Sequence, residues 1–496
     1  MQKIEKYLVT PYKISIFLDE HGIQIYSVEI IFQTEKYNSL CYNIENQILN
    51  ESGFLDSEIL KLDSLINYLQ NTIKRYLEKN NFDFSNKITA YLNDWLVYKI
   101  LGLDTLMSLL LDDKVQEIYL DKPNTLIYID HQDYGRCTTN IELSATDLEA
   151  FKTRLCLEKD TIVNYLNPSL KVELRTKKFH VRAAIDIPPL ASDGFSMNVR
   201  KLRKKIWTLP ELISFNMLTS EAAAYILFVM MRRNNLTIIG EPGSGKTTLA
   251  NAFDLLTPSK WRKITVEDVI ESINQKDFGI FQTRYSVSPF DTKNNMSSKS
   301  DEIIKLLHRS PTWVYLGEIQ TAEHSRALFE ALSAGLVGLQ TCHGQSVEMM
   351  LIRWLNQHKI PTTSILTLDC LIETHSLFQN WKIIRNVFRI VEISKKHLTS
   401  SNFNKSLESL ELIEIFKFDS SRNTLIKKTN LYETPTMQKI RDKEILTEES
   451  FKTELVRYKQ LLDYLVQNKI YNPKTVRDYL INFNKKRLKI PLKSNE

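Results

Sequence analysis

The sequence feature that most constrains this chain is an eight-residue loop pattern, Gly240-Glu241-Pro242-Gly243-Ser244-Gly245-Lys246-Thr247. The loop follows a short apolar run, Leu236–Ile239, and precedes a stretch with helical character that starts at Thr248. Glycines let a backbone fold closely around an anion, so that successive N–H groups and the start of the next helix point at phosphates. The pattern therefore predicts a phosphate-binding loop between a buried strand and a helix.

This loop chemistry assigns roles to its last residues. Lys246 is expected to reach the β- and γ-phosphates of a bound nucleotide, and the Thr247 hydroxyl to ligate Mg²⁺. The predicted ATP-binding residues are Gly240, Glu241, Pro242, Gly243, Ser244, Gly245, Lys246, Thr247 and Thr248.

Composition limits the classes of protein that the chain can belong to. With 496 residues, 43% apolar and 25% charged, it predicts two to four globular domains. The five cysteines are scattered and form no C-x-x-C pair, which favours a reducing compartment. No apolar run approaches the roughly 20 residues that a membrane span needs, and the N-terminus lacks an apolar signal core. We therefore expect a cytoplasmic protein, for which any membrane role must come through a partner.

The C-terminal tail is basic. The last 28 residues carry a net charge of +6, which equals the net charge of the whole chain. Such a tail can contact nucleic acid, anionic lipid or an acidic partner, but solvated lysines that keep a chain soluble explain it equally well. Nucleic-acid binding through the tail is therefore an open interpretation that we do not favour.

Changes in pattern along the chain predict five segments. An adaptor module over residues 1–92 precedes a mixed α/β domain with a largely antiparallel sheet over 93–200. A charged linker, 201–210, leads to the core over 211–400, where strand-like and helical stretches alternate as in a parallel sheet with crossover helices. Residues 401–496 are expected to form a helical C-terminal region that ends in the basic tail.

Two further strands of the core end in acidic residues. Ile264-Thr265-Val266 leads to Glu267 and Asp268, and Trp313–Leu316 leads to Gly317 and Glu318. Ligands of parallel sheets bind at the carboxyl ends of the strands, where a carboxylate can hold the magnesium–water shell or orient an attacking water. A third segment, Leu339–Gly344, brings His343, which could sense a γ-phosphate.

In order and spacing, these motifs resemble those of the type II/type IV secretion and type IV pilus assembly ATPases, particularly the archaeal branch that includes the archaellum motor. The loop resembles the Walker A motif, Glu267-Asp268 the aspartate box, Gly317-Glu318 the Walker B motif and Thr341–Gly344 the histidine box. The likeness covers roughly residues 100–390. It implies an α/β fold: a RecA-like P-loop core with a parallel sheet, preceded by a mixed α/β domain.

The resemblance also implies roles for individual residues. Glu318 would support Mg²⁺ or water, Glu267 would be the general base, and His343 would couple nucleotide state to subunit movement. Arginines of the N-terminal domain complete the site in this family, so Arg182 and Arg200 are the candidates, with Arg284 a weaker one. Such an arginine neutralises charge that develops on the transferring phosphate.

The family likeness further implies a homo-hexamer that hydrolyses ATP with Mg²⁺ at the inner face of the cell membrane. It would drive assembly of pilin-like subunits, indirectly, through an integral membrane platform protein. The alternatives are an ATPase that translocates DNA or protein, and a nucleotide-binding scaffold with little hydrolysis. Gln320 stands where the family usually has an arginine, which bears on fast turnover or on its coupling to the neighbouring subunit.

Overall fold

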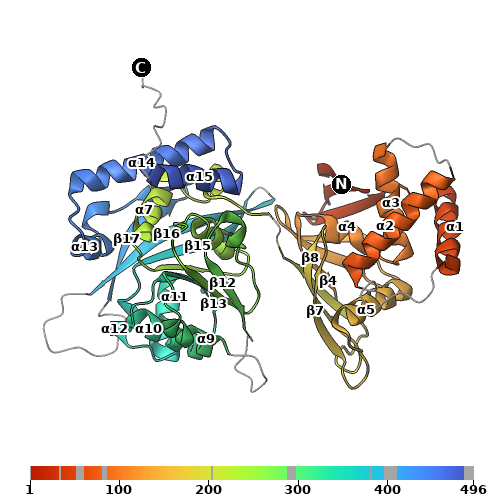
Figure 1. Ribbon diagram of the computed structural model, residues 1–496, viewed down its shortest axis with the longest axis horizontal. Coiled ribbons are helices and arrows are strands. Elements are labelled where there is room, and N and C mark those ends of the chain that lie inside the picture. Colours follow the sequence, from red (N-terminus) through yellow and green to blue (C-terminus); the bar gives the residue numbers. More distant parts are fainter. Residues whose placement is uncertain are drawn as a thin grey trace. The chain divides into compact units, whose positions relative to one another are not determined.

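The computed structural model describes residues 2–32, 35–51, 61–80, 86–202, 205–287, 298–379, 381–395 and 410–484. The chain divides into two compact units (Figure 1). The first comprises Met1–Lys204 together with Phe378–Ile383, and the second comprises Lys205–Leu377 and Ile384–Glu496. Among the helices in the described ranges, none is long and apolar enough to cross a membrane.

A nine-stranded sheet forms the first unit, in the order β1-β2-β3-β6-β5-β4-β9-β8-β7. Neighbouring strands are antiparallel except β3 and β6, which are parallel. Buried and exposed side chains alternate along the strands, as a sheet covered on one face requires. The strands are β1 Gln2–Val9, β2 Tyr12–Leu18, β3 Gln24–Ile30, β4 Val115–Leu120, β5 Leu126–His131, β6 Gly135–Glu142, β7 Ser169–Arg175, β8 His180–Asp186 and β9 Ser196–Lys201.

Five helices pack their apolar sides against this sheet and share one hydrophobic core with it (Figure 1). In α2, six buried apolar residues repeat at three- and four-residue intervals, as an amphipathic helix requires. The helices are α1 Glu35–Glu51, α2 Leu62–Lys79, α3 Asn86–Ile100, α4 Asp104–Leu111 and α5 Ala145–Lys159.

The segments 1–92 and 93–200, which we expected to form separate domains, both contribute strands to this sheet. Residues Ile25 and Tyr26 of β3 pair with Thr138 and Thr139 of β6. This pairing covers a strand edge that would otherwise expose unpaired backbone groups. Sequence periodicity gives no sign of such long-range pairing.

The sheet of the second unit has the order β12-β11-β13-β14-β10-β15-β16-β17-β18. From β12 to β15 the strands are parallel, and the pairings of β16 with β17 and of β17 with β18 are antiparallel. The strands are β10 Leu236–Gly240, β11 Lys263–Glu267, β12 Gln282–Ser286, β13 Trp313–Ile319, β14 Gly338–His343, β15 Cys370–Gln379, β16 Lys382–Lys395, β17 Leu410–Asp419 and β18 Thr424–Lys427.

Helices cover both faces of this sheet, so that every residue of β10 and β11 is buried (Figure 1). One face carries α6 Leu209–Ser214, α7 Ser220–Met231, α8 Lys246–Asp254, α13 Pro435–Arg441, α14 Glu448–Gln467 and α15 Pro473–Asn484. The other carries α9 Lys299–Lys305, α10 Ala322–Ser333, α11 Val347–Ile352 and α12 Thr362–Ile365. The predicted parallel sheet with crossover helices is therefore present.

The C-terminal region differs from the expectation. We predicted residues 401–496 to be helical, but their described part begins with two strands, β17 and β18, which extend the sheet of the second unit. The sequence of β17 alternates apolar and polar residues in part, and its pairing with β16 selects the strand conformation. The end of the basic tail, residues 485–496, lies outside the described residues, and Arg477 of α15 is buried rather than solvated.

Candidate functional site

The carboxyl edge of the parallel strands gathers the residues that the motifs single out. Gly240 at the end of β10 is in register with His343 of β14 on one side and with Thr374 of β15 on the other. Glu318 of β13 is in register with Thr341 of β14, two residues before His343. The register therefore brings the loop, the second acidic strand and the histidine to one edge.

The phosphate loop links the buried strand β10 to helix α8. Gly243 and Gly245 have positive φ angles of 75° and 92°, which glycine adopts without steric cost. A Cβ at Gly240 would lie 2.5 Å from both the Ser244 hydroxyl oxygen and the Thr374 carbonyl oxygen, so only glycine fits there. The loop is thus built for close approach of an anion to the backbone at the start of α8.

A chain of polar contacts crosses the site from Lys246 to Glu318. The Lys246 ammonium donates to the Glu241 carbonyl at 2.8 Å and lies 3.1 Å from Nδ1 of His343. On the other side of the ring, Nε2 of His343 contacts a carboxylate oxygen of Glu318. Lysine is a donor only, so His343 accepts at Nδ1 and donates from Nε2 in this geometry. His343 therefore links the loop lysine to the second acidic strand.

Glu267 ends β11 and is 2% exposed. Its carboxylate accepts hydrogen bonds from the backbone N–H groups of Glu271 and Ser272, at 3.2 and 3.1 Å, and from the Ser272 hydroxyl. Burial raises the pKa of Glu267 to about 7, while these hydrogen bonds act in the opposite direction. The group is therefore poised to exchange a proton near neutral pH, which suits a general base.

A buried lysine that the motifs did not predict lies at this edge. The side chain of Lys299, the first residue of α9, is fully buried, and its ammonium lies 2.7 Å from Oδ1 of Asp268 and 2.5 Å from the Glu318 carbonyl oxygen. Lys299 thus joins the ends of β11 and β13. Its neighbours Ser298 and Ser300 resemble the polar surroundings of an exposed lysine, so the sequence carries no signal of burial.

Arg353 is a second residue that sequence analysis missed. It begins a short π-helical turn, Arg353–Gln357, that follows α11, and it donates to the His343 carbonyl at 2.7 Å. Single π turns within helices are frequent at functional sites. Arg353 therefore holds the backbone of His343 while the ring contacts Lys246 and Glu318.

The predicted magnesium ligands offer suitable oxygen atoms. Thr247 is the second residue of α8 and Glu318 lies on β13, so a hydroxyl and a carboxylate belong to the two motifs that bound the site. The described residues contain no cluster of three or more His, Cys, Asp or Glu side chains able to hold a metal ion by themselves. This donor set fits Mg²⁺, which commonly takes one or two protein oxygens and completes its shell with water and substrate phosphates.

Gln320 contacts the predicted catalytic carboxylate. Its side-chain amide donates to Oε2 of Glu318, while the other oxygen of that carboxylate contacts His343. Both oxygens of Glu318 are thus engaged. An arginine, which the motif resemblance led us to expect at this position, would carry a charge here that Gln320 lacks.

The predicted arginines belong to different sheets. Arg182 of β8 and Arg200 of β9 are direct cross-strand partners in the first unit, and Arg200 Nε lies 3.8 Å from Oε1 of Glu117. Arg200 is therefore a residue of a strand and not of a linker. Arg284 lies on β12 of the second unit and approaches the Ser272 carbonyl at 3.5 Å. The phosphate loop and the acidic strands also belong to the second unit.

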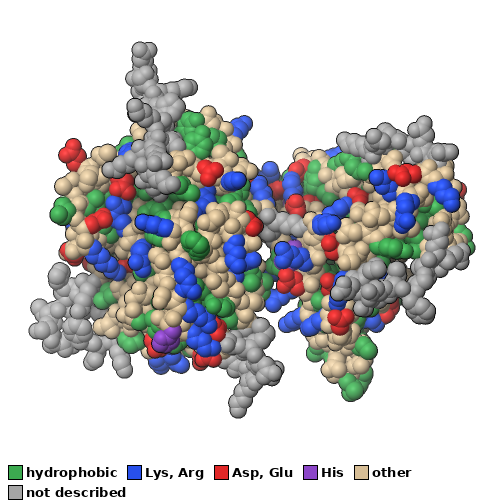
Figure 2. All heavy atoms as spheres, viewed as in Figure 1, with side chains coloured by type: hydrophobic (Ala, Val, Ile, Leu, Met, Phe, Trp, Pro, Cys, Tyr) green, Lys and Arg blue, Asp and Glu red, His purple; other side chains and the backbone are tan. Residues whose placement is uncertain are grey.

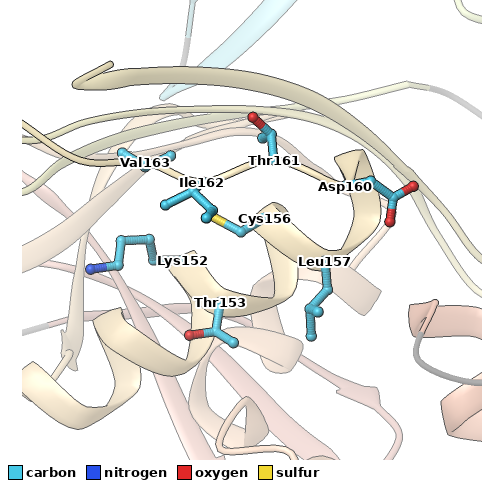
Figure 3. A pocket seen from close by; sticks show the side chains of 8 residues that line it. All are labelled: Lys152, Thr153, Cys156, Leu157, Asp160, Thr161, Ile162 and Val163. Atoms are coloured by element: carbon cyan, nitrogen blue, oxygen red, sulfur yellow. The ribbon is translucent and has the colours of Figure 1, made fainter. Parts of the chain in front are cut away.

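A pocket in the first unit carries none of these motif residues (Figure 3). It lies at the C-terminal half of α5, and Lys152 and Asp160 stand at opposite ends of it. The lining residues are Lys152, Thr153, Cys156, Leu157, Asp160, Thr161, Ile162 and Val163. We assign no chemistry to this pocket.

Comparison with known proteins identifies the family. The model of the type II/IV secretion system protein family matches residues 96–444, more than half of the chain. The chain is similar to the uncharacterized protein MJ1287 of Methanocaldococcus jannaschii, with 25% identity over 253 residues, 50% of this chain and 89% of that protein. It is also similar to the type IV secretion system protein PtlH of Bordetella pertussis, with 26% identity over 260 residues, 48% of this chain and 75% of that protein.

Among solved structures, the ATPase DotB of Legionella pneumophila aligns with 20% identity and a TM-score of 0.40, over 58% of this chain and 78% of that one. The family match covers the phosphate loop, both acidic strands, His343 and the two arginines of the first unit. This chain therefore belongs to the type II/IV secretion system protein family, a family of ATPases.

Proposed function

We propose that this protein hydrolyses ATP at the carboxyl edge of the sheet in its second unit. The observation that carries the proposal is the chain of contacts Lys246–His343–Glu318 beside the phosphate loop. Nucleotide phosphates bound at the start of α8 would lie next to Lys246, and the loop N–H groups would hold them. Because His343 contacts both Lys246 and Glu318, a γ-phosphate that binds beside Lys246 would change the surroundings of the His343 ring.

Each residue in the proposed mechanism has one task. Lys246 neutralises the β- and γ-phosphates, and Thr247 and Glu318 would hold Mg²⁺, which would supply further positive charge at the phosphates. Glu267 is the candidate for accepting a proton from the attacking water. Its raised pKa matches that task at neutral pH. Lys299 and Arg353 keep Glu318 and His343 in place through their backbone carbonyls.

The family relationship supports a motor role for this chemistry. In the proposed cycle a homo-hexamer in the cytoplasm acts at the inner face of the membrane through an integral membrane platform protein. Arg182 and Arg200 complete the nucleotide site from the first unit, and nucleotide turnover changes the angle between the two units. The work done is assembly of a type IV pilus-like filament from pilin-like subunits, or secretion.

A nucleotide-binding scaffold with little hydrolysis is the second candidate, and the hydrogen bond from Gln320 to Glu318 favours it. That bond occupies one oxygen of the carboxylate that we propose as a ligand of Mg²⁺. A parent protein that binds ATP without turnover, together with an active Gln320→Arg variant, would support the scaffold reading.

Translocation of DNA is less favoured. On the face drawn in Figure 2, Lys and Arg side chains lie interspersed with Asp, Glu and polar groups over both units. Nucleic-acid binding depends on several phosphate contacts and weakens steeply with salt. Binding of single-stranded DNA by the full chain that weakens as the salt concentration rises would support this alternative.

The Glu318→Gln variant tests the proposed chemistry. It should bind ATP and assemble like the parent protein but lose hydrolysis, because the carboxylate that supports Mg²⁺ or water is gone. Glu323→Gln, at a half-exposed position in the first turn of α10, is the matched control and should hydrolyse ATP at the parent rate. Parent-rate hydrolysis by Glu318→Gln would remove Glu318 from the mechanism.

A further inference from the structure

An arginine outside the recognised motifs holds the phosphate loop. Arg385 lies near the start of β16, and its Nε donates to the carbonyl oxygen of Gly243 at 2.6 Å. The adjoining N–H of the same peptide group, that of Ser244, donates to the Glu241 carbonyl at 3.2 Å. Both polar atoms of the peptide between Gly243 and Ser244 therefore have defined partners.

Packing brings the stem of Arg385 against the loop as well. A Cβ placed on Gly245 would lie 3.8 Å from Cδ of Arg385 and 3.1 Å from Cε of Met217. Met217 is itself tied to the same strand, because its carbonyl accepts the N–H of Val387 at 2.7 Å. The start of β16 and the segment before α7 thus bracket the two positive-φ glycines of the loop.

The next arginine on the same face of β16 has a different environment. Arg389 contacts three carboxylates, those of Glu348, Glu373 and Glu414, and its charge is neutralised locally. Arg385 has among its partners a neutral carbonyl of the phosphate loop. Arg389 thus belongs to a network of ion pairs, and Arg385 places its guanidinium beside the backbone of the phosphate loop.

We infer that Arg385 is a positioning residue for the phosphates of a bound nucleoside di- or triphosphate. Glycines on both sides of Ser244 allow the intervening peptide groups to rotate at little cost. A rotated peptide between Gly243 and Ser244 would aim its carbonyl oxygen at the phosphates. By holding the Gly243 carbonyl, Arg385 keeps the loop in the anion-binding orientation before ligand arrives, and its charge adds to the attraction. The inference rests on the proposed nucleotide site for its class of ligand.

The test is ADP binding by the full chain, measured by calorimetric titration for the parent, Arg385→Gln, Arg385→Lys and Arg422→Gln. Arg422 is an exposed arginine of the second unit whose ion-pair partner is Asp419, so its replacement controls for loss of one positive charge. We expect the ADP dissociation constant of Arg385→Gln to rise about tenfold, which corresponds to about 1.4 kcal/mol. Arg385→Lys should recover part of the loss, and Arg422→Gln should bind like the parent.

Competition by pyrophosphate separates a phosphate effect from a general structural one. If Arg385 acts on the loop, pyrophosphate should compete about tenfold less well in Arg385→Gln, in proportion to ADP, while the unfolding midpoint without ligand stays at the parent value. Equal ADP affinity in Arg385→Gln and the parent would overturn the inference and leave the proposed function standing. If Arg385→Gln does not fold, equal affinity in Arg385→Lys and the parent would overturn it instead. A parent chain that binds no ADP would refute the proposed function itself.

Discussion

The two sheets of this protein carry their polar chemistry in different places. In the first unit, helices cover one face of a largely antiparallel sheet, and the other face presents a row of charged residues in cross-strand register. From β6 to β7 the row is Arg136, Asp130, Glu117, Arg200, Arg182 and Glu173. In the second unit both faces of the parallel strands are buried, so the reactive groups lie at the strand ends.

The difference teaches how covering a sheet restricts its chemistry. A sheet buried on both faces can expose polar groups to a ligand only at the ends of its strands. In the second unit, the carboxyl ends carry Glu267, Glu318 and His343, and the amino ends form a separate edge. At the amino edge, Lys263 of β11 lies 2.8 Å from Asp254, the last residue of α8, and both side chains are buried. Trp313 Nε1 donates to the other carboxylate oxygen at 2.9 Å. The amino edge is thus structural, whereas the carboxyl edge is the candidate for chemistry.

The largest expected effect tests the structural amino edge. Lys263→Met should lower the free energy of unfolding by about 3–5 kcal/mol, because it leaves the Asp254 carboxylate buried without its cation. Chemical denaturation measures the loss, and nucleotide affinity of the folded fraction should stay close to that of the parent. A variant of parental stability would contradict the separation of the two edges.

The next prediction concerns pH and the two buried carboxyl groups of the second unit. Burial raises the folded-state pKa of Glu267 and of Glu392 to about 7. Each carboxyl group holds its proton more tightly in the folded state than in the unfolded state. The free energy of unfolding therefore falls as pH rises from the unfolded pKa, near 4.5, to about 7. Glu267→Gln should reduce that loss by roughly 3 kcal/mol, measured by denaturation at pH 5 and pH 8.

Glu392→Gln is the matched control, because Glu392 is also a buried carboxyl group but belongs to none of the motifs. It accepts hydrogen bonds from the Tyr225 hydroxyl and the Thr436 N–H inside the second unit. The control variant should flatten the pH dependence of stability to a similar degree without affecting ATP hydrolysis. Glu267→Gln should flatten that dependence and also abolish turnover. Equal turnover in the two variants would remove Glu267 as the general base.

A smaller effect is expected on the open face of the first unit. Arg200→Ala should slow ATP turnover tenfold or more, about 1.4 kcal/mol of barrier. Its half-exposed ion pair with Glu117 contributes little to stability, so the unfolding free energy should change by less than about 1 kcal/mol. Arg175→Ala, on the exposed side of β7, is the control and should turn over normally. A parental rate for Arg200→Ala would leave this row without a role in hydrolysis.

The smallest effect is expected at the far end of the same row. Arg136 lies over the stacked rings of Tyr119 and Tyr128, at 4.7 and 5.1 Å from their centroids, and pairs with Asp130. Arg136→Ala should lower stability by about 0.5–1 kcal/mol and leave turnover unchanged. A large loss of turnover would mean that the functional part of the row extends beyond Arg182 and Arg200.

Local patterns predicted the parts of the site that follow strands. The glycine loop after β10, the carboxylates after β11 and on β13, and His343 on β14 each combine an apolar run with a polar end, which the sequence displays directly. Lys299, Arg353 and Arg385 escaped prediction because only the fold brings each of them to a backbone carbonyl of the candidate site, 19, 10 and 142 residues away in sequence. The single sheet of the first unit was missed for the same reason, since the distant pairing of β3 with β6 leaves no local period. Strands β17 and β18 instead form a local hairpin, within a region that we expected to be helical.

The most direct test of the central claim is Mg²⁺-dependent ATP hydrolysis by the parent chain beside Lys246→Ala, with protein concentration varied through the range of assembly. We predict that turnover per chain rises as subunits associate and is lost in Lys246→Ala, because the lysine of the Lys246–His343–Glu318 chain is gone. Hydrolysis by Lys246→Ala at the parent rate would place the reaction elsewhere and contradict the account.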